Sequence, residues 1–183
     1  MRNSKGFTLI ELLVTMVILG IIMVVAVPNV MGILNNSRAN TYVEDAKKFL
    51  SLAEYKFRGT SSITRPSKGN KCIIMSLKYL DNSEFENAPN NGSYDKNNSY
   101  VVITNTGSGS GKNNYVYYVN LVENVDGSSV RGIPVSSYST LYDSEPSDLV
   151  KTKQSDFPSI SSISGSSYCS GGIMSGGLYN TAD

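Results

Sequence analysis

The sequence predicts an α+β protein in which a long N-terminal helix packs against a small antiparallel sheet of about three or more strands. Three features support this expectation. They are an apolar run at the N-terminus, a helical spacing of apolar residues after Pro28, and alternating segments joined by a tight-turn signal after residue 99. A chain of 183 residues has room for one ordinary domain with an extension, so a second domain is not expected.

The apolar run Phe7–Val27 contains twenty-one residues and a single charge, that of Glu11. A helix of this length spans roughly 31 Å, which matches a hydrocarbon core of about 30 Å. A short basic head with Arg2 and Lys5 precedes the run. Because basic residues favour the cytoplasmic side, we expect a single pass through the cytoplasmic membrane, with the N-terminus in the cytoplasm and the rest of the chain outside.

Two ordinary interpretations of this run are incomplete. A secretory signal peptide has an apolar region of about 7–15 residues followed by a small-residue cleavage site. Here the run is longer, and Val24-Val25-Ala26 matches such a site poorly. A plain membrane anchor fits the length, but it leaves Glu11 unexplained, because an ionised carboxylate inside the bilayer costs about 3 kcal/mol or more.

The string Lys5-Gly6-Phe7-Thr8-Leu9-Ile10-Glu11 resembles the prepilin processing site of type IV pilins. The resemblance implies that a membrane peptidase cuts between Gly6 and Phe7 and methylates the new amino group of Phe7. The leader, residues 1–6, is then removed, and the apolar run stays in the mature chain. Glu11 falls four residues beyond the new N-terminus, where this family has its glutamate. The motif is specific because its residues must occur at fixed spacing, but it covers only residues 5–28.

The charge of Glu11 suggests a role in assembly. A filament core of packed apolar helices has few ways to fix axial register, and a carboxylate removed from water seeks a positive partner. The free amine of Phe7 in a neighbouring copy would supply that partner. Because the unpaired charge is costly in lipid, pairing would favour assembly.

After Pro28 the apolar residues recur at steps of three and four, as on one face of an amphipathic helix. This stripe contains Val30, Ile33, Leu34, Tyr42, Ala46, Phe49, Leu50, Ala53 and Phe57. We therefore expect one helix from about Phe7 to Arg58, roughly 78 Å long.

Gly20 and Pro28 both weaken helix interiors, and Pro28 also removes a backbone donor. The residues alone predict a kink at Pro28. The pilin resemblance implies that the helix can melt between these two residues within a filament.

The rest of the chain is predicted to be mainly β. Ser99–Thr104 and Asn114–Val122 are candidate strands, and Asp126-Gly127 is a tight-turn signal, after which Ser128–Val135 returns as a third strand. These strands form an antiparallel meander. Alternation places Tyr115 and Tyr117 on one face and Tyr118 on the other, and packing of the sheet accounts for them.

Two segments are less well defined by their patterns. Cys72–Leu80 is a short apolar element of open type, for which the spacing of Met75, Leu77 and Leu80 favours a helix. The chain after Leu141 is rich in serine and glycine, and no structure is assigned to it.

Composition argues against an enzyme and against nucleic-acid binding. The chain has no histidine and two cysteines, which excludes histidine triads, histidine metal sites and a zinc site built by one chain. The formal net charge is +1, and Arg2 and Lys5 account for more than that excess. Strong attraction to nucleic acid is therefore not expected, and no motif requires a cofactor.

Two further groups of residues have alternative interpretations. Cys72 and Cys169 would both face an oxidising exterior. Many pilins have a disulfide in their C-terminal region, which favours a bridge between these two residues. The alternative is that both are buried free thiols. The acidic residues Asp143, Glu145 and Asp148 have a spacing compatible with calcium, although a solvated acidic turn is the commoner arrangement.

The predicted function is that of a structural subunit that polymerises into a type IV pilus, a surface filament. Pili of this family serve adhesion, motility, aggregation or DNA uptake, and all four uses stay open. The segments are a leader (1–6), a membrane and filament-core helix (7–28) and a globular domain (29–183). Implied partners are membrane lipid, the prepilin peptidase, an assembly ATPase with its membrane platform, and copies of the chain itself. The alternatives are a pseudopilin or minor pilin, and a membrane-anchored extracellular binding module.

Overall fold

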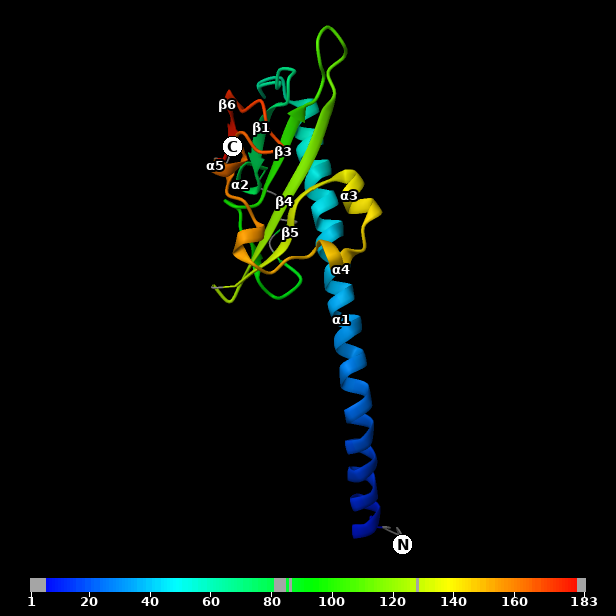
Figure 1. Ribbon diagram of the computed structural model, residues 1–183. Helices are drawn as coiled ribbons and strands as arrows, with labels where there is room; N and C mark the ends of the chain where they lie inside the picture. The colour runs from blue at the N-terminus through cyan, green and yellow to red at the C-terminus, as the bar shows by residue number, and fades with distance from the viewer. Residues whose placement is uncertain (1–5, 81–84, 86, 128, 181–183) are drawn as a thin grey trace. The chain divides into compact units, whose positions relative to one another are not determined.

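The computed structural model describes residues 6–80, 85, 87–127 and 129–180 (Figure 1). Helix α1 (Leu9–Gly59) is followed by a sheet of six described strands and by short helices. By its internal contacts the chain divides into two units, Met1–Ser37 and Arg38–Asp183, and α1 contributes residues to both. The predicted long helix and the α+β class are confirmed.

After α1, most of the strands come first, and a series of short helices separates β5 from β6. The strands are β1 (Lys71–Ser76), β2 (Ser93–Tyr94), β3 (Tyr100–Asn105), β4 (Tyr115–Val125), β5 (Ser129–Ser137) and β6 (Ile173–Tyr179). The helices are α2 (Leu77–Leu80), α3 (Tyr138–Asp143), α4 (Pro146–Leu149), the 3-10 helix η2 (Gln154–Asp156) and α5 (Ile160–Ile163).

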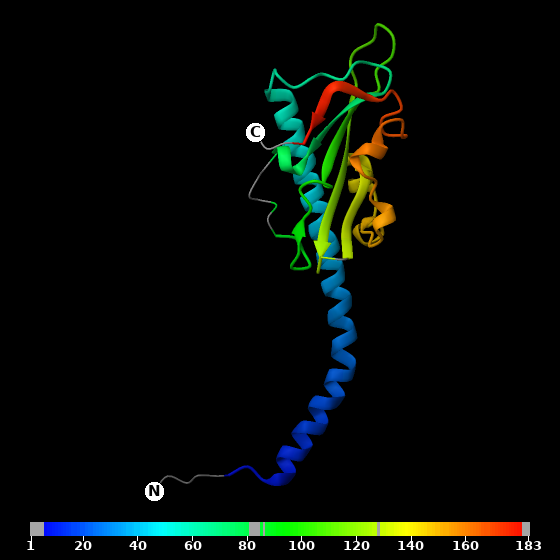
Figure 2. The same cartoon turned by 90° about the vertical axis from the view of Figure 1, so that its left-hand side faces the viewer.

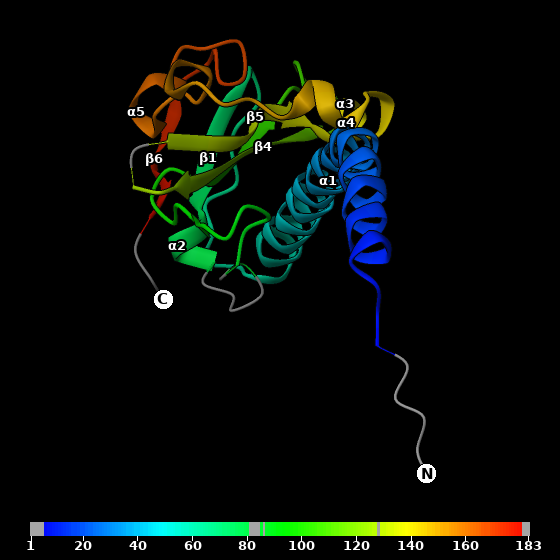
Figure 3. The same cartoon turned by 90° about the horizontal axis from the view of Figure 1, so that it is seen from below.

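The second half of α1 lies along the sheet (Figure 3). It packs on the sheet through one stripe of side chains. The buried residues of the helix recur at steps of one, three and four: Ala39, Tyr42, Val43, Ala46, Phe49, Leu50, Ala53 and Phe57. The spacing predicted this face from Tyr42 onward. Val30, Ile33 and Leu34 were expected on the same stripe but are exposed, because they belong to the unit Met1–Ser37, which contains no sheet to cover them.

The predicted meander is present as β3, β4 and β5, each antiparallel to the next. β3 and β4 pair from Tyr100↔Asn120 to Asn105↔Tyr115. β4 and β5 meet at Val125↔Ser129, across a turn in which Asp126 and Gly127 have φ values of 52° and 72°. Because glycine and aspartate tolerate positive φ better than most residues, this turn chemistry sets the register of the hairpin.

The sheet extends beyond the meander in a way that the patterns did not predict. β1 is antiparallel to β3 on one side and parallel to β6 on the other, and β2 pairs with β4 at Tyr94↔Glu123. The helix favoured for Cys72–Leu80 is therefore wrong for Lys71–Ser76 and holds only for α2. A strand buried on both faces is a continuous apolar run without alternation, so the pattern cannot distinguish it from a buried helix.

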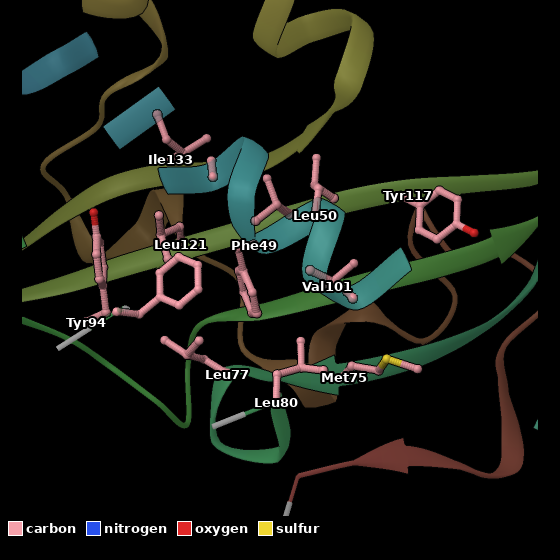
Figure 4. Packing of buried hydrophobic residues seen from close by; sticks show 14 of the residues in the cluster. Phe49, Leu50, Met75, Leu77, Leu80, Tyr94, Val101, Tyr117, Leu121 and Ile133 are labelled. Atoms are coloured by element: carbon pink, nitrogen blue, oxygen red, sulfur yellow. The ribbon is translucent and has the colours of Figure 1, made fainter. Parts of the chain in front are cut away.

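Apolar clusters cover both faces of the sheet. The larger cluster joins α1 to the sheet and includes Phe49, Leu50, Val101 and Leu121 (Figure 4). The smaller one lies on the opposite face, between the sheet and the C-terminal segment (Figure 2), and consists of Cys72, Ile74, Tyr100, Val102, Ile163 and Cys169. The chain after Leu141, to which the sequence patterns assigned no structure, thus covers the second face of the sheet.

A disulfide between Cys72 and Cys169 fastens this cover to β1, with a Cα–Cα distance of 5.5 Å. The Tyr100 hydroxyl donates to the Pro158 carbonyl at 2.7 Å, and the Thr104 hydroxyl donates to the Tyr168 carbonyl. The covalent link therefore joins strand β1 to a segment 97 residues later in the chain.

A buried carboxylate joins α1, β4 and the segment before β2. Glu123 is fully buried and accepts hydrogen bonds from the Tyr42 hydroxyl, from the amide of Asn90 at 3.2 Å and from the amide of Gly92 at 3.0 Å. The side-chain amide of Asn90 donates to the Tyr42 oxygen at 2.6 Å and to Glu123 at 3.2 Å. Burial raises the pKa of Glu123, while the Gly92 and Asn90 amides and the charge of Arg131 oppose that rise.

Gly132 on β5 lies close to the backbone of β4, next to the place where the β4–β5 register shifts. A Cβ atom at this position would lie 1.9 Å from the Leu121 carbonyl oxygen. We expect Gly132→Ala to lower the free energy of unfolding by about 2–4 kcal/mol, because the backbone of β4 would have to move. Urea unfolding followed by tyrosine near-UV circular dichroism measures this change. Gly59→Ala, where a Cβ meets nothing within 4 Å, is the control, and an equal effect of the two substitutions would contradict the prediction.

Candidate processing and assembly site

The proposed scissile pair lies in non-helical, exposed backbone immediately before α1. Gly6, Phe7 and Thr8 precede the first helical residue, Leu9, and the side chain of Phe7 is 86% exposed. The other leader residues, 1–5, lie outside the described part of the chain. An extended, accessible peptide bond is the form that a peptidase requires, because a helical bond must first unwind.

Thr8 and Glu11 form a capping box at the start of α1. The amide and the hydroxyl of Thr8 both donate to Glu11 Oε2 at 2.8 Å, and the Glu11 amide donates to the Thr8 hydroxyl at 3.4 Å. This reciprocal arrangement satisfies backbone donors that a helix start leaves free. The role of Thr8 was not predicted, although threonine followed three residues later by glutamate is the known signal for such a cap.

The capping box gives the two oxygens of the Glu11 carboxylate different surroundings. One oxygen, Oε2, is held by Thr8 close to the positive end of the helix dipole, which stabilises a negative charge. The other oxygen, Oε1, accepts no hydrogen bond from any residue in the described part of the chain. Glu11 is thus oriented by its own helix and retains one oxygen for a positive group outside it.

The helix that follows is covered by apolar side chains all round. Twenty large apolar side chains between Phe7 and Leu34 are exposed. By length and composition, α1 is one helix that qualifies to cross a membrane, and none of the qualifying stretch is buried within the protein. Such a surface is stable only in lipid or against other apolar surfaces.

Gly20 and Pro28 both lie within α1, which is helical through both positions. Beside Pro28, the Asn29 side chain donates to the Val25 carbonyl at 3.1 Å. Melting between Gly20 and Pro28 in a filament remains a prediction.

The acidic residues Asp143, Glu145 and Asp148 lie at the end of α3, before α4 and within α4. They do not come together as ligands: among the described residues, no three aspartate, glutamate, histidine or cysteine side chains are arranged to hold a metal ion. The arrangement corresponds to an exposed acidic turn.

The N-terminal segment matches known proteins. Residues 1–27 match the family described as the prokaryotic N-terminal methylation motif. The chain is also similar to the type IV wide pilus major component PilA4 of Thermus thermophilus, with 42% identity over 55 residues. That match covers 28% of this chain and 42% of PilA4, so the chain spans less than half the length of this relative. No solved structure matches the chain.

The matched segment, residues 1–27, contains the proposed scissile pair, the capping box and the beginning of helix α1. Its methylation motif and the similarity to a pilus component agree with the predicted fold. Together these observations show that residues 1–27 carry the prokaryotic N-terminal methylation motif and that the chain is similar to a component of a type IV pilus.

Proposed function

We propose that this chain is the precursor of a repeating structural subunit of a type IV pilus. The observation that carries the proposal is the long helix with apolar side chains on all sides, beginning at a capped glutamate next to an exposed Gly6-Phe7 bond. Pilins are structural proteins and not enzymes. The name of the Thermus thermophilus relative, a major component of a wide pilus, supports a repeating subunit over a minor one.

Processing comes first in the proposed mechanism. The prepilin peptidase cuts between Gly6 and Phe7, and the new amino group of Phe7 is methylated. The run Phe7–Val27 then holds the subunit in the cytoplasmic membrane with its N-terminus on the cytoplasmic side, and the unit Arg38–Asp183 lies outside.

Assembly replaces lipid by neighbouring helices. The apolar side chains of α1 pack against those of other copies. Because many axial registers of neighbouring helices bury a similar apolar area, this burial alone does not select one register. Glu11 removes this ambiguity, because its free Oε1 pairs with the Phe7 amine of a neighbouring copy and a misaligned copy leaves the charge unpaired. An assembly ATPase and its membrane platform supply the work of extraction.

Mass spectrometry of the N-terminus tests this proposal. Protein sheared from the cell surface and protein left in the membrane are compared. We expect sheared filaments to contain chains that begin at N-methylated Phe7. The same N-terminus found solely in the membrane would replace the proposal by a pseudopilin. A chain that still begins at Met1 would leave a membrane-anchored binding module.

Substitutions at Glu11 test the register mechanism. We expect Glu11→Ala to be processed normally and to reduce the filament yield more than about tenfold, because the paired charge is lost. Glu11→Gln retains an acceptor for Thr8 and removes only the charge, so it should fail similarly. Quantitative immunoblotting of sheared and membrane fractions measures both outcomes. Glu44→Ala removes an exposed carboxylate of the same helix and serves as the control. A wild-type yield from Glu11→Gln would exclude the charge as the register device.

A further inference from the structure

Two open hollows meet along one edge of β4, and tyrosine rings form much of their walls. The first has a volume of about 410 Å³ and is lined by Phe57, Arg58, Arg65, Tyr115 and Tyr117. The second, of about 380 Å³, is lined by residues 115–118 and 137–139. Both are lined in part by Tyr115 and Tyr117, so they adjoin each other on β4, and we call the two together the tyrosine groove. All of its residues belong to the unit Arg38–Asp183.

The floor of the tyrosine groove is a strand edge without a partner strand. The β4–β5 ladder ends at Tyr118↔Ser137, whereas β3 continues along the other side as far as Tyr115. The Thr106 amide donates to the Asn114 carbonyl at 2.8 Å. By antiparallel alternation, the amide and carbonyl of the next residue, Tyr115, then point away from β3. No strand of the described sheet pairs with Tyr115 on that side, so its backbone groups are available to a ligand.

The cations beside the groove are already engaged within the protein. Arg58 forms an ion pair with Glu54 at 2.6 Å. Arg65 donates to the carbonyls of Phe57, Arg58 and Thr60 at the end of α1, and its guanidinium lies 4.2 Å from the centre of the Phe57 ring. A nucleic acid strand needs cations that are free to replace its counterions. The groove therefore favours a neutral ligand.

The remaining groups are aromatic rings and hydroxyls. The Tyr115 ring packs edge-on against Phe57 with a centroid distance of 5.1 Å, and the Tyr115 hydroxyl bonds to none of the described residues. Ser139 is exposed, and its hydroxyl exchanges a hydrogen bond with Ser137 at 2.9 Å. Tyr138 continues the aromatic surface through a stacked contact with Tyr142.

We propose that the tyrosine groove binds a neutral oligosaccharide. A sugar ring has an apolar face of C–H groups that packs on an aromatic ring, and a rim of hydroxyls that both donate and accept. The groove matches both properties, since the partly exposed rings of Tyr115 and Tyr138 can pack on the face of a sugar, and hydroxyls and the Tyr115 backbone can bond to its rim. This activity would be independent of polymerisation.

Saturation-transfer difference NMR tests the proposal on the full processed chain, held in a detergent without a sugar head group. The probes are maltohexaose, cellohexaose and tri-N-acetylchitotriose. We expect at least one of them to bind, and Tyr115→Ala to raise its Kd about tenfold through the loss of one stacked ring. Tyr55→Ala removes a 78% exposed tyrosine outside the groove and should leave the Kd unchanged.

A second variant separates binding from folding, because Tyr115 also packs on Phe57. Ser139→Trp fills the groove from an exposed position, so it should abolish binding while the thermal midpoint stays within about 2 °C of wild type. Absence of binding by all three sugars would overturn the proposal. Equal losses from Tyr55→Ala and Tyr115→Ala would overturn it too, as would oligothymidylate binding more tightly than the sugars. None of these outcomes would affect the processing of Phe7, which is read separately by mass spectrometry.

Discussion

Reduction of the Cys72–Cys169 disulfide is expected to lower the free energy of unfolding by about 4 kcal/mol. The bridge closes a loop with a sequence separation of 97, and in the chain-entropy model a loop of about 100 residues is worth about 4.7 kcal/mol. Urea unfolding with and without dithiothreitol measures the difference. The double variant Cys72→Ser, Cys169→Ser should reproduce the reduced value without a reductant.

When the bridge is reduced, we expect the C-terminal segment to unfold before the rest of the domain. Without the bridge, the C-terminal cover keeps the bond from Tyr100 to the Pro158 carbonyl and the contact between the Tyr118 and Tyr168 rings, 5.2 Å apart. The cluster between α1 and the sheet does not include either cysteine. We therefore expect proteolytic cleavage to begin between residues 157 and 171 in the reduced chain. A stability loss below about 1 kcal/mol would contradict the structural role of the bridge.

Glu123→Ala is expected to cost about 3 kcal/mol or more of unfolding free energy. The substitution leaves the Tyr42 hydroxyl and the amides of Asn90 and Gly92 without their acceptor, and each unsatisfied buried donor costs about 1–3 kcal/mol. Glu123→Gln retains one carbonyl oxygen and should cost less. Glu44→Ala, at an exposed carboxylate, is the control and should be nearly neutral. Equal stabilities of Glu123→Ala and Glu44→Ala would refute the prediction.

The pH dependence of stability gives a second measurement of Glu123. Since burial raises its pKa in the folded state, the native protein binds this proton more tightly than the unfolded chain. The contribution of Glu123 to the free energy of unfolding is fully present below the pKa that it has in the unfolded chain, near the usual glutamate value. This contribution is lost as the pH rises through the pKa that it has in the folded protein. We expect Glu123→Gln to remove this part of the profile. An unchanged profile in the variant would mean that the folded pKa of Glu123 is not raised.

Asp95 should change the pH dependence of stability in the direction opposite to Glu123, so it serves as a comparison. Burial tends to raise the pKa of Asp95, but hydrogen bonds from the Asn98 side chain and from the amides of Asn98 and Asn97 outweigh it and lower the pKa. Its contribution is therefore present above the unfolded aspartate pKa and is lost as the pH falls through the folded pKa. Asp95→Asn should flatten the acid side of the profile.

Sequence patterns predicted the elements in which local spacing and burial agree. The stripe from Tyr42 to Phe57 has a helical period because a single face is covered, and the Asp126-Gly127 turn fixes its hairpin by its own φ values. β1 was missed because both of its faces are buried. β6 was missed because its sequence, IMSGGLY, is rich in glycine and is held in the sheet by tertiary contacts such as the ring contact between Tyr79 and Tyr179.

The site residues also differ in how far the sequence alone predicts them. Gly6, Phe7 and Glu11 were predicted because their motif is contiguous, and Thr8 belongs to that same string as the cap of the helix. Glu123 carries no such signal, since its donors Tyr42 and Asn90 lie 81 and 33 residues away. A lone glutamate in a strand predicts an exposed position. Only the packing of three segments makes it an interior group.

The parallel pairing of β6 with β1 sets the time at which the domain can be completed. A ribosome releases β1 well before the segment that contains Ile163 and Cys169, so the sheet face that carries Ile74 and Val102 stays uncovered until that segment emerges. Pairings so distant in sequence form slowly, because a long loop must close before they add stability. The Cys72–Cys169 disulfide, formed when an external oxidant accepts two electrons from the two thiols, is then a covalent record that synthesis passed residue 169. A chain that stops before residue 169 cannot form that bridge and leaves an open apolar sheet face, the kind of surface by which quality-control proteases and chaperones recognise unfinished molecules.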